Sequence, residues 1–217
     1  KAVSPNNHYI GNLACHIHVA GLLKDTAMFS NRYRSKVKRA YQAQILRQFH
    51  EDGGHFEGSL HYHVATLELC LFSELALSRT GQTLSTAARD RLTQAMSFSA
   101  TVCDDRCIFP HFGDSDDGRY LVLDLSETRQ CANLLALKDQ SFVPPKADQR
   151  LSAVVFWGQR SKNAQTPLNL PLVYHPITGA VISRQKHFFF YQDVGSIGFL
   201  GRGSHGHNDL SSFVLQM

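Results

Sequence analysis

The 217-residue sequence lacks any segment that could cross a membrane as a helix, because no apolar run approaches the roughly 20 residues required. Its first residues show no signal-peptide pattern. It also contains no internal repeat and no low-complexity run. The chain begins without a methionine and ends in the apolar run "SSFVLQM", so we expect a fragment of a longer protein.

Cysteine is scarce and unsuitably spaced for a disulfide framework or a zinc site. The five cysteines are an odd number, and the pair Cys103 and Cys107 has no second pair to complete a zinc site. Cys15, Cys70 and Cys131 lie in apolar helical contexts, where a thiol behaves as a small buried apolar group. The cysteines therefore favour neither an oxidising nor a reducing compartment.

A strong excess of one charge is also missing, since the net charge is only +4 with histidine neutral. The one dense basic run is "NRYRSKVKRAYQ", which on a helix is more typical of a solvated face than of a nucleic-acid site. We therefore predict no nucleic-acid partner. Twelve histidines are an unusual number, and clustered imidazoles favour a site that binds metals or handles protons.

The first 140 residues are predicted to be helical. Apolar residues recur at spacings of three and four, most clearly at Leu60, Val64, Leu67 and Leu71, which is typical of one buried helical stripe. Ser85 or Thr86 could provide an N-cap. The predicted helices cover residues 10–24, 34–51, 56–81, 84–103 and 126–139.

The character of the chain changes after the segment "SFVPPKADQR". The stretch "LNLPLVYHP" indicates a loop. From residue 180 onward, runs rich in Val, Ile and Phe and punctuated by glycine predict strands. These strands cover residues 180–185, 187–195, 196–201 and 210–217. The sequence therefore predicts helices followed by the beginning of a β domain.

Two polar clusters lie in the helical part. In "NNHYIGN", the asparagines could simply cap the helix that follows. In "DGGHFEGSLHYH", the spacing of Ser59, Tyr62, His63 and Thr66 predicts a polar stripe beside the core stripe. That stripe could line a cleft, or Tyr62 could pack at the core edge with its hydroxyl in water.

Two further clusters lie nearer the C-terminus. In "RGSHGHNDLSSF", alternation along a strand would put His205 and His207 on the same face, as suits a metal ligand beside a proton-transfer group. The segment "GDSDDGR" faintly resembles a calcium loop starting at Asp114. Because the closing glutamate position is Leu125, a tight acidic turn with Arg119 paired to an aspartate is the favoured interpretation.

Together these clusters resemble the heparinase II/III superfamily of polysaccharide lyases, which includes alginate and oligoalginate lyases. The order is the same: an Asn-His element, then "DGGHFEGSLHYH", then "GDSDDGR", then "GRGSHGHNDLSSF". The last segment is the most specific of the four. The matching segments extend from Pro5 to Phe213.

The resemblance implies a multidomain α+β protein in which an (α/α) toroid precedes an antiparallel β-sandwich, with part of each in this chain. Residues 1–160 would be the C-terminal part of the toroid. Residues 161–217 would be a linker and the first sandwich strands. The implied activity is β-elimination in a uronic-acid-containing polysaccharide without an organic cofactor, in a periplasmic or secreted protein rather than a cytoplasmic one.

The resemblance also implies roles for individual residues. Tyr62 would be the acid, and also the base for one uronate epimer, and His205 would be the base for the other. Asn7 or His8 would neutralise the substrate carboxylate. His207 would bind a structural zinc whose remaining ligands are expected beyond Met217. The predicted substrate-binding residues are Glu57, His63 and Arg202, the first two by orienting Tyr62 or fixing the start of its helix.

Two other functions remain open. A zinc-dependent hydrolase could use His205, His207 and Asp209, and would lose activity to chelators. A non-catalytic glycan-binding or polysaccharide-assembly protein would be unaffected by Tyr62→Phe. The predicted partner is an acidic uronate polysaccharide, and a homodimer is left open.

Overall fold

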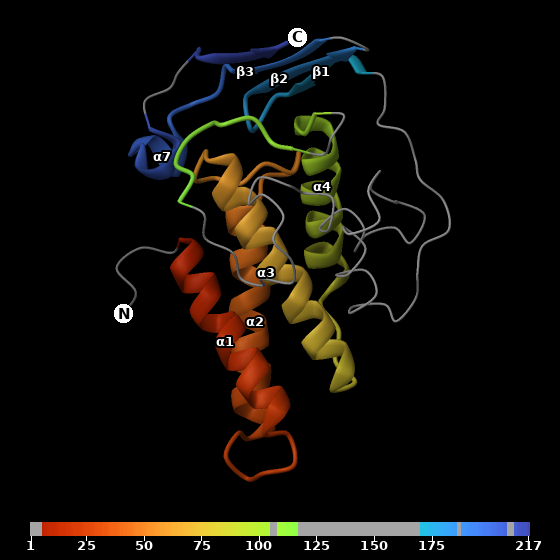
Figure 1. The fold of residues 1–217 in the computed structure, drawn as a ribbon. Helices are drawn as coiled ribbons and strands as arrows, with labels where there is room; N and C mark the ends of the chain where they lie inside the picture. Colours follow the sequence, from red (N-terminus) through yellow and green to blue (C-terminus); the bar gives the residue numbers. More distant parts are fainter. Residues whose placement is uncertain (1–5, 105–107, 117–169, 186–187, 208–210) are drawn as a thin grey trace, which may run out of the picture.

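The computed structural model describes residues 6–104, 108–116, 170–185, 188–207 and 211–217 (Figure 1). In this part of the chain, four long helices precede a four-stranded sheet. The sheet lies across one end of the helices. The helices are α1 (Asn7–Leu22), α2 (Asn31–Gln48), α3 (Leu60–Arg79) and α4 (Thr86–Val102).

Serine side chains begin three of these helices. Ser30, Ser59 and Ser85 are the N-caps of α2, α3 and α4, and each hydroxyl accepts a hydrogen bond from the backbone N–H three residues later. Such a cap satisfies a donor that the helix itself leaves unpaired. The cap expected at Ser85 or Thr86 is therefore Ser85.

The sheet is antiparallel, with its strands in the order β1-β2-β3-β4. In the central pair, Ile182 lies opposite Tyr191 and Arg184 opposite Phe189. The side chains of this register face the helices and are buried. The strands are β1 (Leu170–His175), β2 (Ala180–Gln185), β3 (Phe188–Asp193) and β4 (Phe213–Gln216).

Two hydrophobic clusters form the core. The first lies between the four helices and includes Tyr41, Ile45 and Leu67, all with 0% exposure. The second joins the end of α4 to the inner face of the sheet and includes Phe98 and Ile182. Because the second cluster packs α4 against the sheet, it sets the position of the sheet relative to the start of α3.

Two local predictions were wrong. Residues 168–176, expected to be a loop, contain the edge strand β1. Residues 196–201, expected to be a strand, form the single turn α7 (Gly198–Gly201), in which Phe199 and Leu200 have positive φ angles of 55° and 58°. Phe199 N donates to Phe56 O at 2.7 Å, so this turn is held against the segment before α3.

The α+β organisation is confirmed, whereas the toroid and the sandwich stay predictions. The predicted helix at 126–139 and the predicted domain boundary near residue 160 lie outside the described residues. None of the described helices is long and apolar enough to cross a membrane.

The carboxylate of Asp52 ties the helical part to the β1–β2 hairpin. Its Oδ2 accepts from the backbone N–H of Ile177 at 2.7 Å and of Thr178 at 2.8 Å. Its Oδ1 accepts from Thr178 Oγ1 at 2.6 Å. On the other side of the turn, His175 Nδ1 lies 3.0 Å from Asp52 O. These contacts of Asp52 join residues more than 120 positions apart in the sequence, and they hold the β1–β2 hairpin in place relative to the helices.

We expect Asp52→Ala to lower the free energy of unfolding by about 2 to 3 kcal/mol, because three hydrogen bonds to a charged acceptor are lost. The adjacent Glu51 is the matched control. Its ion pair with Arg91 is 3.8 Å long, and the side chain of Glu51 is 79% exposed. Glu51→Ala should therefore lower the free energy of unfolding by less than about 1 kcal/mol. Urea unfolding of both variants measures the difference. Equal losses of unfolding free energy would contradict a stabilising role for the Asp52 hydrogen bonds.

A candidate active site where the helices meet the sheet

Three segments far apart in the sequence meet at the start of α3: residues 56–59, 112–116 and 198–207. Leu60 N donates to Phe112 O at 3.2 Å, and Asp114 N donates to His205 O at 2.7 Å. Gly113 has a φ of +70°, and a Cβ there would lie 2.5 Å from His205 O. Only glycine therefore allows these backbones to approach so closely.

Tyr62 and His205 are stacked at this junction. Their ring centroids are 3.6 Å apart and their planes differ by 12°. Tyr62 lies in the first turn of α3, and His205 in the 3₁₀ turn η2 (Ser204–Gly206). The two predicted proton-transfer residues, 143 positions apart in the numbering, are thus in direct contact.

Glu57 lies beneath this pair with 0% exposure. Its Oε1 accepts from the backbone N–H of Asn7 at 2.7 Å, and its Oε2 lies 3.4 Å from His205 Nε2. Burial raises the pKa of Glu57, while the Asn7 hydrogen bond and the nearby His205 and His8 oppose that shift. Glu57 therefore links the start of α1 to the imidazole of His205.

Asp114 joins the two histidines of the C-terminal motif. Its Oδ2 lies 2.9 Å from His205 Nδ1, and its Oδ1 is hydrogen-bonded to His207 Nε2. The hydrogen bond from His205 lowers the pKa of Asp114, against the opposing effect of burial. The strand expected here is a 3₁₀ turn, so the two imidazoles come together through a shared carboxylate rather than through strand alternation.

Asp116 contacts the hydroxyl end of Tyr62. Tyr62 Oη donates to Asp116 Oδ2 at 2.7 Å, and His61 Nε2 lies 3.2 Å from Asp116 Oδ1. Burial and this hydrogen bond both raise the pKa of Tyr62. The phenol is therefore held in its protonated form.

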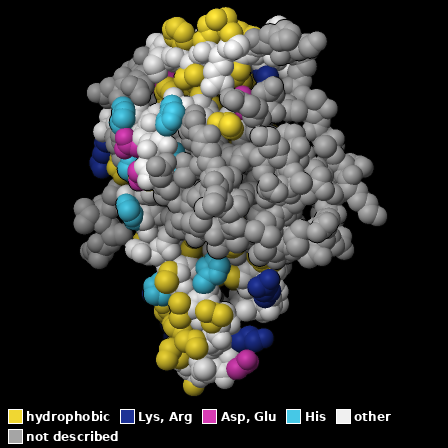
Figure 2. Space-filling model, viewed as in Figure 1, with side chains coloured by type: hydrophobic (Ala, Val, Ile, Leu, Met, Phe, Trp, Pro, Cys, Tyr) yellow, Lys and Arg dark blue, Asp and Glu magenta, His cyan; other side chains and the backbone are white. Residues whose placement is uncertain are grey.

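The other predicted site residues have different surroundings. Asn7 is buried in the first turn of α1, its Oδ1 accepting from His8 N at 2.9 Å, whereas the side chain of His8 is exposed. Arg202 is exposed at the end of α7. Figure 2 shows histidine and acidic side chains gathered on one face below the sheet.

His63 points away from Tyr62 into the core. Its Nε2 lies 2.8 Å from Ser99 Oγ on α4, and its ring packs edge-on against Phe49 and Phe98. Burial lowers the pKa of His63 to about 3. This placement supports a role for His63 in fixing the start of α3; its predicted contribution to substrate binding stays a prediction.

We expect the protein to become less stable as the pH falls from about 6.5 to 5. His55 and His63 are buried, and burial holds the pKa of both in the folded chain below the value of 6.5 that applies when they are exposed. The unfolded chain then binds more protons than the folded chain, at a cost of about 1.4 kcal/mol per pH unit for each histidine. Urea unfolding across this range should give a shallower pH slope for His63→Gln, and parallel slopes would contradict the account.

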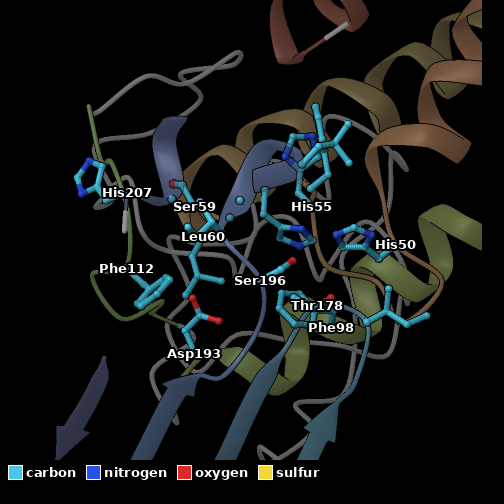
Figure 3. Close-up of a pocket in the computed structure, with 18 of the residues that line it drawn as sticks. His50, His55, Ser59, Leu60, Phe98, Phe112, Thr178, Asp193, Ser196 and His207 are labelled. Atoms are coloured by element: carbon cyan, nitrogen blue, oxygen red, sulfur yellow. The ribbon is translucent and has the colours of Figure 1, made fainter. Parts of the chain in front are cut away.

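A cavity lies between the helices and the sheet (Figure 3). His55, His63 and His207 line it, whereas Tyr62, His205 and Glu57 do not. Figure 3 shows His50 and His55 on one side and Ser59, His207 and Phe112 on the other, with Thr178 and Asp193 from the sheet side below. The cavity therefore has walls from the segment before α3, from the β1–β2 hairpin and from the C-terminal motif. A ligand in it would contact both parts of the protein.

The described residues do not by themselves form a metal centre. Among them, no group of three or more His, Cys, Asp or Glu side chains is arranged to hold a metal ion. His207 faces Asp114, and Asp209, required by the hydrolase alternative, lies outside the described residues. The zinc ligand role of His207 thus stays a prediction.

Asp114 and Asp116 are the residues that sequence reasoning missed. The segment "GDSDDGR" was interpreted as a tight acidic turn, with Arg119, outside the described residues, as the partner. The pairing with Arg119 therefore stays a prediction, and the structure shows in addition that Asp114 contacts His205 and Asp116 contacts Tyr62. The useful signal was the alternation of acidic residues directly after Gly113, which could have indicated two carboxylates projecting from one loop.

Comparison with known proteins identifies a family for this chain. The family model described as heparinase II/III N-terminus matches residues 4–136, which is more than half of the chain. A search of curated proteins gives no match.

Solved structures show the same fold. A heparinase III, the BT4657 gene product, superposes with a TM-score of 0.70 at 16% identity, over 97% of this chain and 31% of its own. Another heparinase III gives 0.68 at 16% identity, over 97% and 33%. The heparan sulfate lyase HepC from Pedobacter heparinus gives 0.63 at 17% identity, over 97% and 31%.

This chain spans about a third of the length of these solved structures. The likeness in structure covers 97% of this chain, more than the residues 4–136 that the family model matches. The resemblance inferred from the four motifs is confirmed: the chain belongs to the heparinase II/III superfamily.

Proposed function

We propose that this protein is a polysaccharide lyase that cleaves a uronic-acid-containing polysaccharide by β-elimination. The observation that carries the proposal is the stack of Tyr62 on His205 above the buried Glu57. It supplies two proton-transfer groups in direct contact at the junction of the three segments. The solved relatives are named as heparinases and a heparan sulfate lyase, which supports an acidic polysaccharide as substrate.

The reaction needs three functions. The C5 proton of a uronate is only weakly acidic, and its removal puts additional negative charge on the carboxylate. Hydrogen-bond donors must therefore stabilise that charge, and Asn7 or His8 is the candidate. A base then takes the C5 proton and an acid protonates the leaving O4. Tyr62 and His205 are the candidates for these two steps.

Two carboxylates orient the imidazole of His205 in the site. Asp114 and Glu57 approach the two ring nitrogens of His205 at 2.9 and 3.4 Å and so fix the plane of the imidazole. Glu57 also accepts from the N-terminus of α1, which brings Asn7 and His8 to the same site. Glu57 thus orients His205 and the start of α1.

The remaining parts of the proposal concern the whole protein. We propose that the helices belong to an (α/α) toroid and that a second sheet covers the outer face of β1–β4. Exposed apolar residues on that face support this cover: Leu172, Tyr174, Phe213 and Leu215. Figure 2 shows hydrophobic side chains gathered at that end of the molecule. A zinc ion bound by His207 and later residues, a homodimer and a periplasmic or secreted location stay predictions.

The proposal is tested with the longest form of the protein that can be purified. It is incubated with heparan sulfate, hyaluronan, chondroitin, alginate and glucuronate-containing capsule polymers. Elimination leaves a C4–C5 double bond conjugated to the carboxylate, so ultraviolet absorbance should rise on at least one polymer. New reducing ends without absorbance would favour the hydrolase, and neither signal on any polymer would refute a lyase acting on these substrates.

A further inference from the structure

Two residues to which the proposed reaction gives no part, Asp116 and His61, are linked to the hydroxyl group of Tyr62. Asp116 accepts the phenolic proton at 2.7 Å through Oδ2. The other carboxylate oxygen of Asp116 lies 3.2 Å from Nε2 of His61. Tyr62, Asp116 and His61 therefore form a chain of three polar groups.

The backbone fixes the position of Asp116 relative to α3. Ser59 Oγ donates to Asp114 O at 2.7 Å and also accepts from Tyr62 N at 3.2 Å. One hydroxyl thus binds both the acidic loop and the turn that carries Tyr62. The backbone two residues before Asp116 is thus tied to the turn that carries Tyr62.

His61 is an unusual partner because its side chain is only 5% exposed. Among the described residues, neither of its ring nitrogens has an aligned hydrogen-bond partner. A buried imidazole without such partners is costly unless a nearby group compensates it. The carboxylate of Asp116 at 3.2 Å is that group, so His61 restrains the rotation of the carboxylate that accepts from Tyr62.

This arrangement favours one protonation state of the phenol. A phenolate beside the Asp116 carboxylate would place two negative charges next to each other. A neutral phenol instead gives the carboxylate a hydrogen bond. Burial and that hydrogen bond both raise the pKa of Tyr62, in agreement with the geometry.

We propose that Asp116, restrained by His61, is the positioning residue that orients the Tyr62 hydroxyl and, by disfavouring the phenolate, returns Tyr62 to the neutral phenol after each proton donation to the leaving group. The proposal rests on the proposed lyase function. In the step concerned, a base takes the C5 proton, the C5–H electron pair forms the C4–C5 double bond, and the C4–O4 bond breaks. O4 takes the proton of Tyr62, and the resulting phenolate regains a proton from water.

The test compares Asp116→Asn and Asp116→Glu with wild type in the full chain. On a natural uronate polymer, Asp116→Asn should lower kcat about 10- to 100-fold and leave KM within about two-fold. Asp116→Glu, which retains the carboxylate, should recover part of the loss. The control is Asp90→Asn on the exposed side of α4, which should leave kcat unchanged.

A second substrate separates proton donation from a structural effect. A short uronide with an aryl group on O4 loses a phenolate, which needs no proton from Tyr62. On this substrate, Asp116→Asn should be within about two-fold of wild type. An equal loss on both substrates, or no loss on either, would overturn the proposal.

The role of His61 is tested with a double variant. His61→Asn should lower kcat less than Asp116→Asn, and adding it to Asp116→Asn should cause no further loss, because both act through the same carboxylate. Fully additive losses would overturn the restraint by His61. A wild-type protein that releases no unsaturated product from any polymer would instead refute the proposed function, and the role of Asp116 with it.

Discussion

Tyr62→Phe is expected to lower the kcat of elimination about 10²- to 10⁴-fold, the range typical of losing one general acid or base. The substitution keeps the ring that stacks on His205 at 3.6 Å. It removes only the hydroxyl that donates to Asp116. Stability should therefore change little while the reaction is almost lost, and absorbance of the unsaturated product measures the rate.

Tyr33→Phe is the matched control for this substitution. The hydroxyl of Tyr33 also takes part in a hydrogen bond, at 2.8 Å with His16 Nδ1, at the far end of the helices. This variant should retain wild-type kcat. A Tyr62→Phe protein as active as Tyr33→Phe would mean that the phenol has no part in the chemistry, as expected of a non-catalytic glycan-binding protein.

Phe98→Ala is expected to lower the free energy of unfolding by about 3 to 5 kcal/mol. Phe98 is 1% exposed and belongs to the cluster that packs α4 against the sheet. Its ring contacts His63 of α3 and His175 of β1, at centroid distances of 5.1 and 4.9 Å. Removing it leaves a cavity where the helices and the sheet meet, so lyase activity should fall together with stability.

Two variants calibrate that result. Phe98→Leu nearly conserves the apolar volume and should cost less than about 1.5 kcal/mol. Leu22→Ala, at a position 84% exposed at the end of α1, should be nearly neutral. Chemical denaturation measures all three, and a Phe98→Ala loss below about 1 kcal/mol would show that this cluster does not hold the sheet on α4.

The helices could be predicted because their signals are local. Apolar residues at spacings of three and four occur throughout α3, and serine caps begin α2, α3 and α4. Strand β1 was missed because Pro171 interrupts it, and proline is typical of loops. At the edge of a sheet, however, proline need not donate to a neighbouring strand, and Pro171 O instead accepts from Ser183 Oγ.

The short turn α7 was wrongly predicted to be a strand. Its residues are apolar and typical of a strand, but Phe199 and Leu200 adopt positive φ angles. The turn is held by Phe199 N donating to Phe56 O and by the close approach of Gly198 to Glu57 O. These contacts join residues more than 140 positions apart, so no local pattern could indicate them.

The sequence indicated most residues of the candidate site but not the contacts between them. The motifs indicated Tyr62, His205, His207 and Glu57, and the structure brings these residues to one junction. The connecting carboxylate of Asp114 could not be identified from spacing, because it comes from a separate loop. Its position depends on how Gly113 packs against Ser59 and His205, which is a property of the folded chain.

The measurement that tests the central claim most directly is mass spectrometry of the products formed in ¹⁸O-labelled water. Elimination breaks the C4–O4 bond without adding water, so the products should carry no ¹⁸O and their masses should sum to that of the substrate. Hydrolysis would add one labelled oxygen at each cleavage. Unlabelled, unsaturated products from wild type, absent with Tyr62→Phe, are the predicted result, and labelled products would contradict the lyase account.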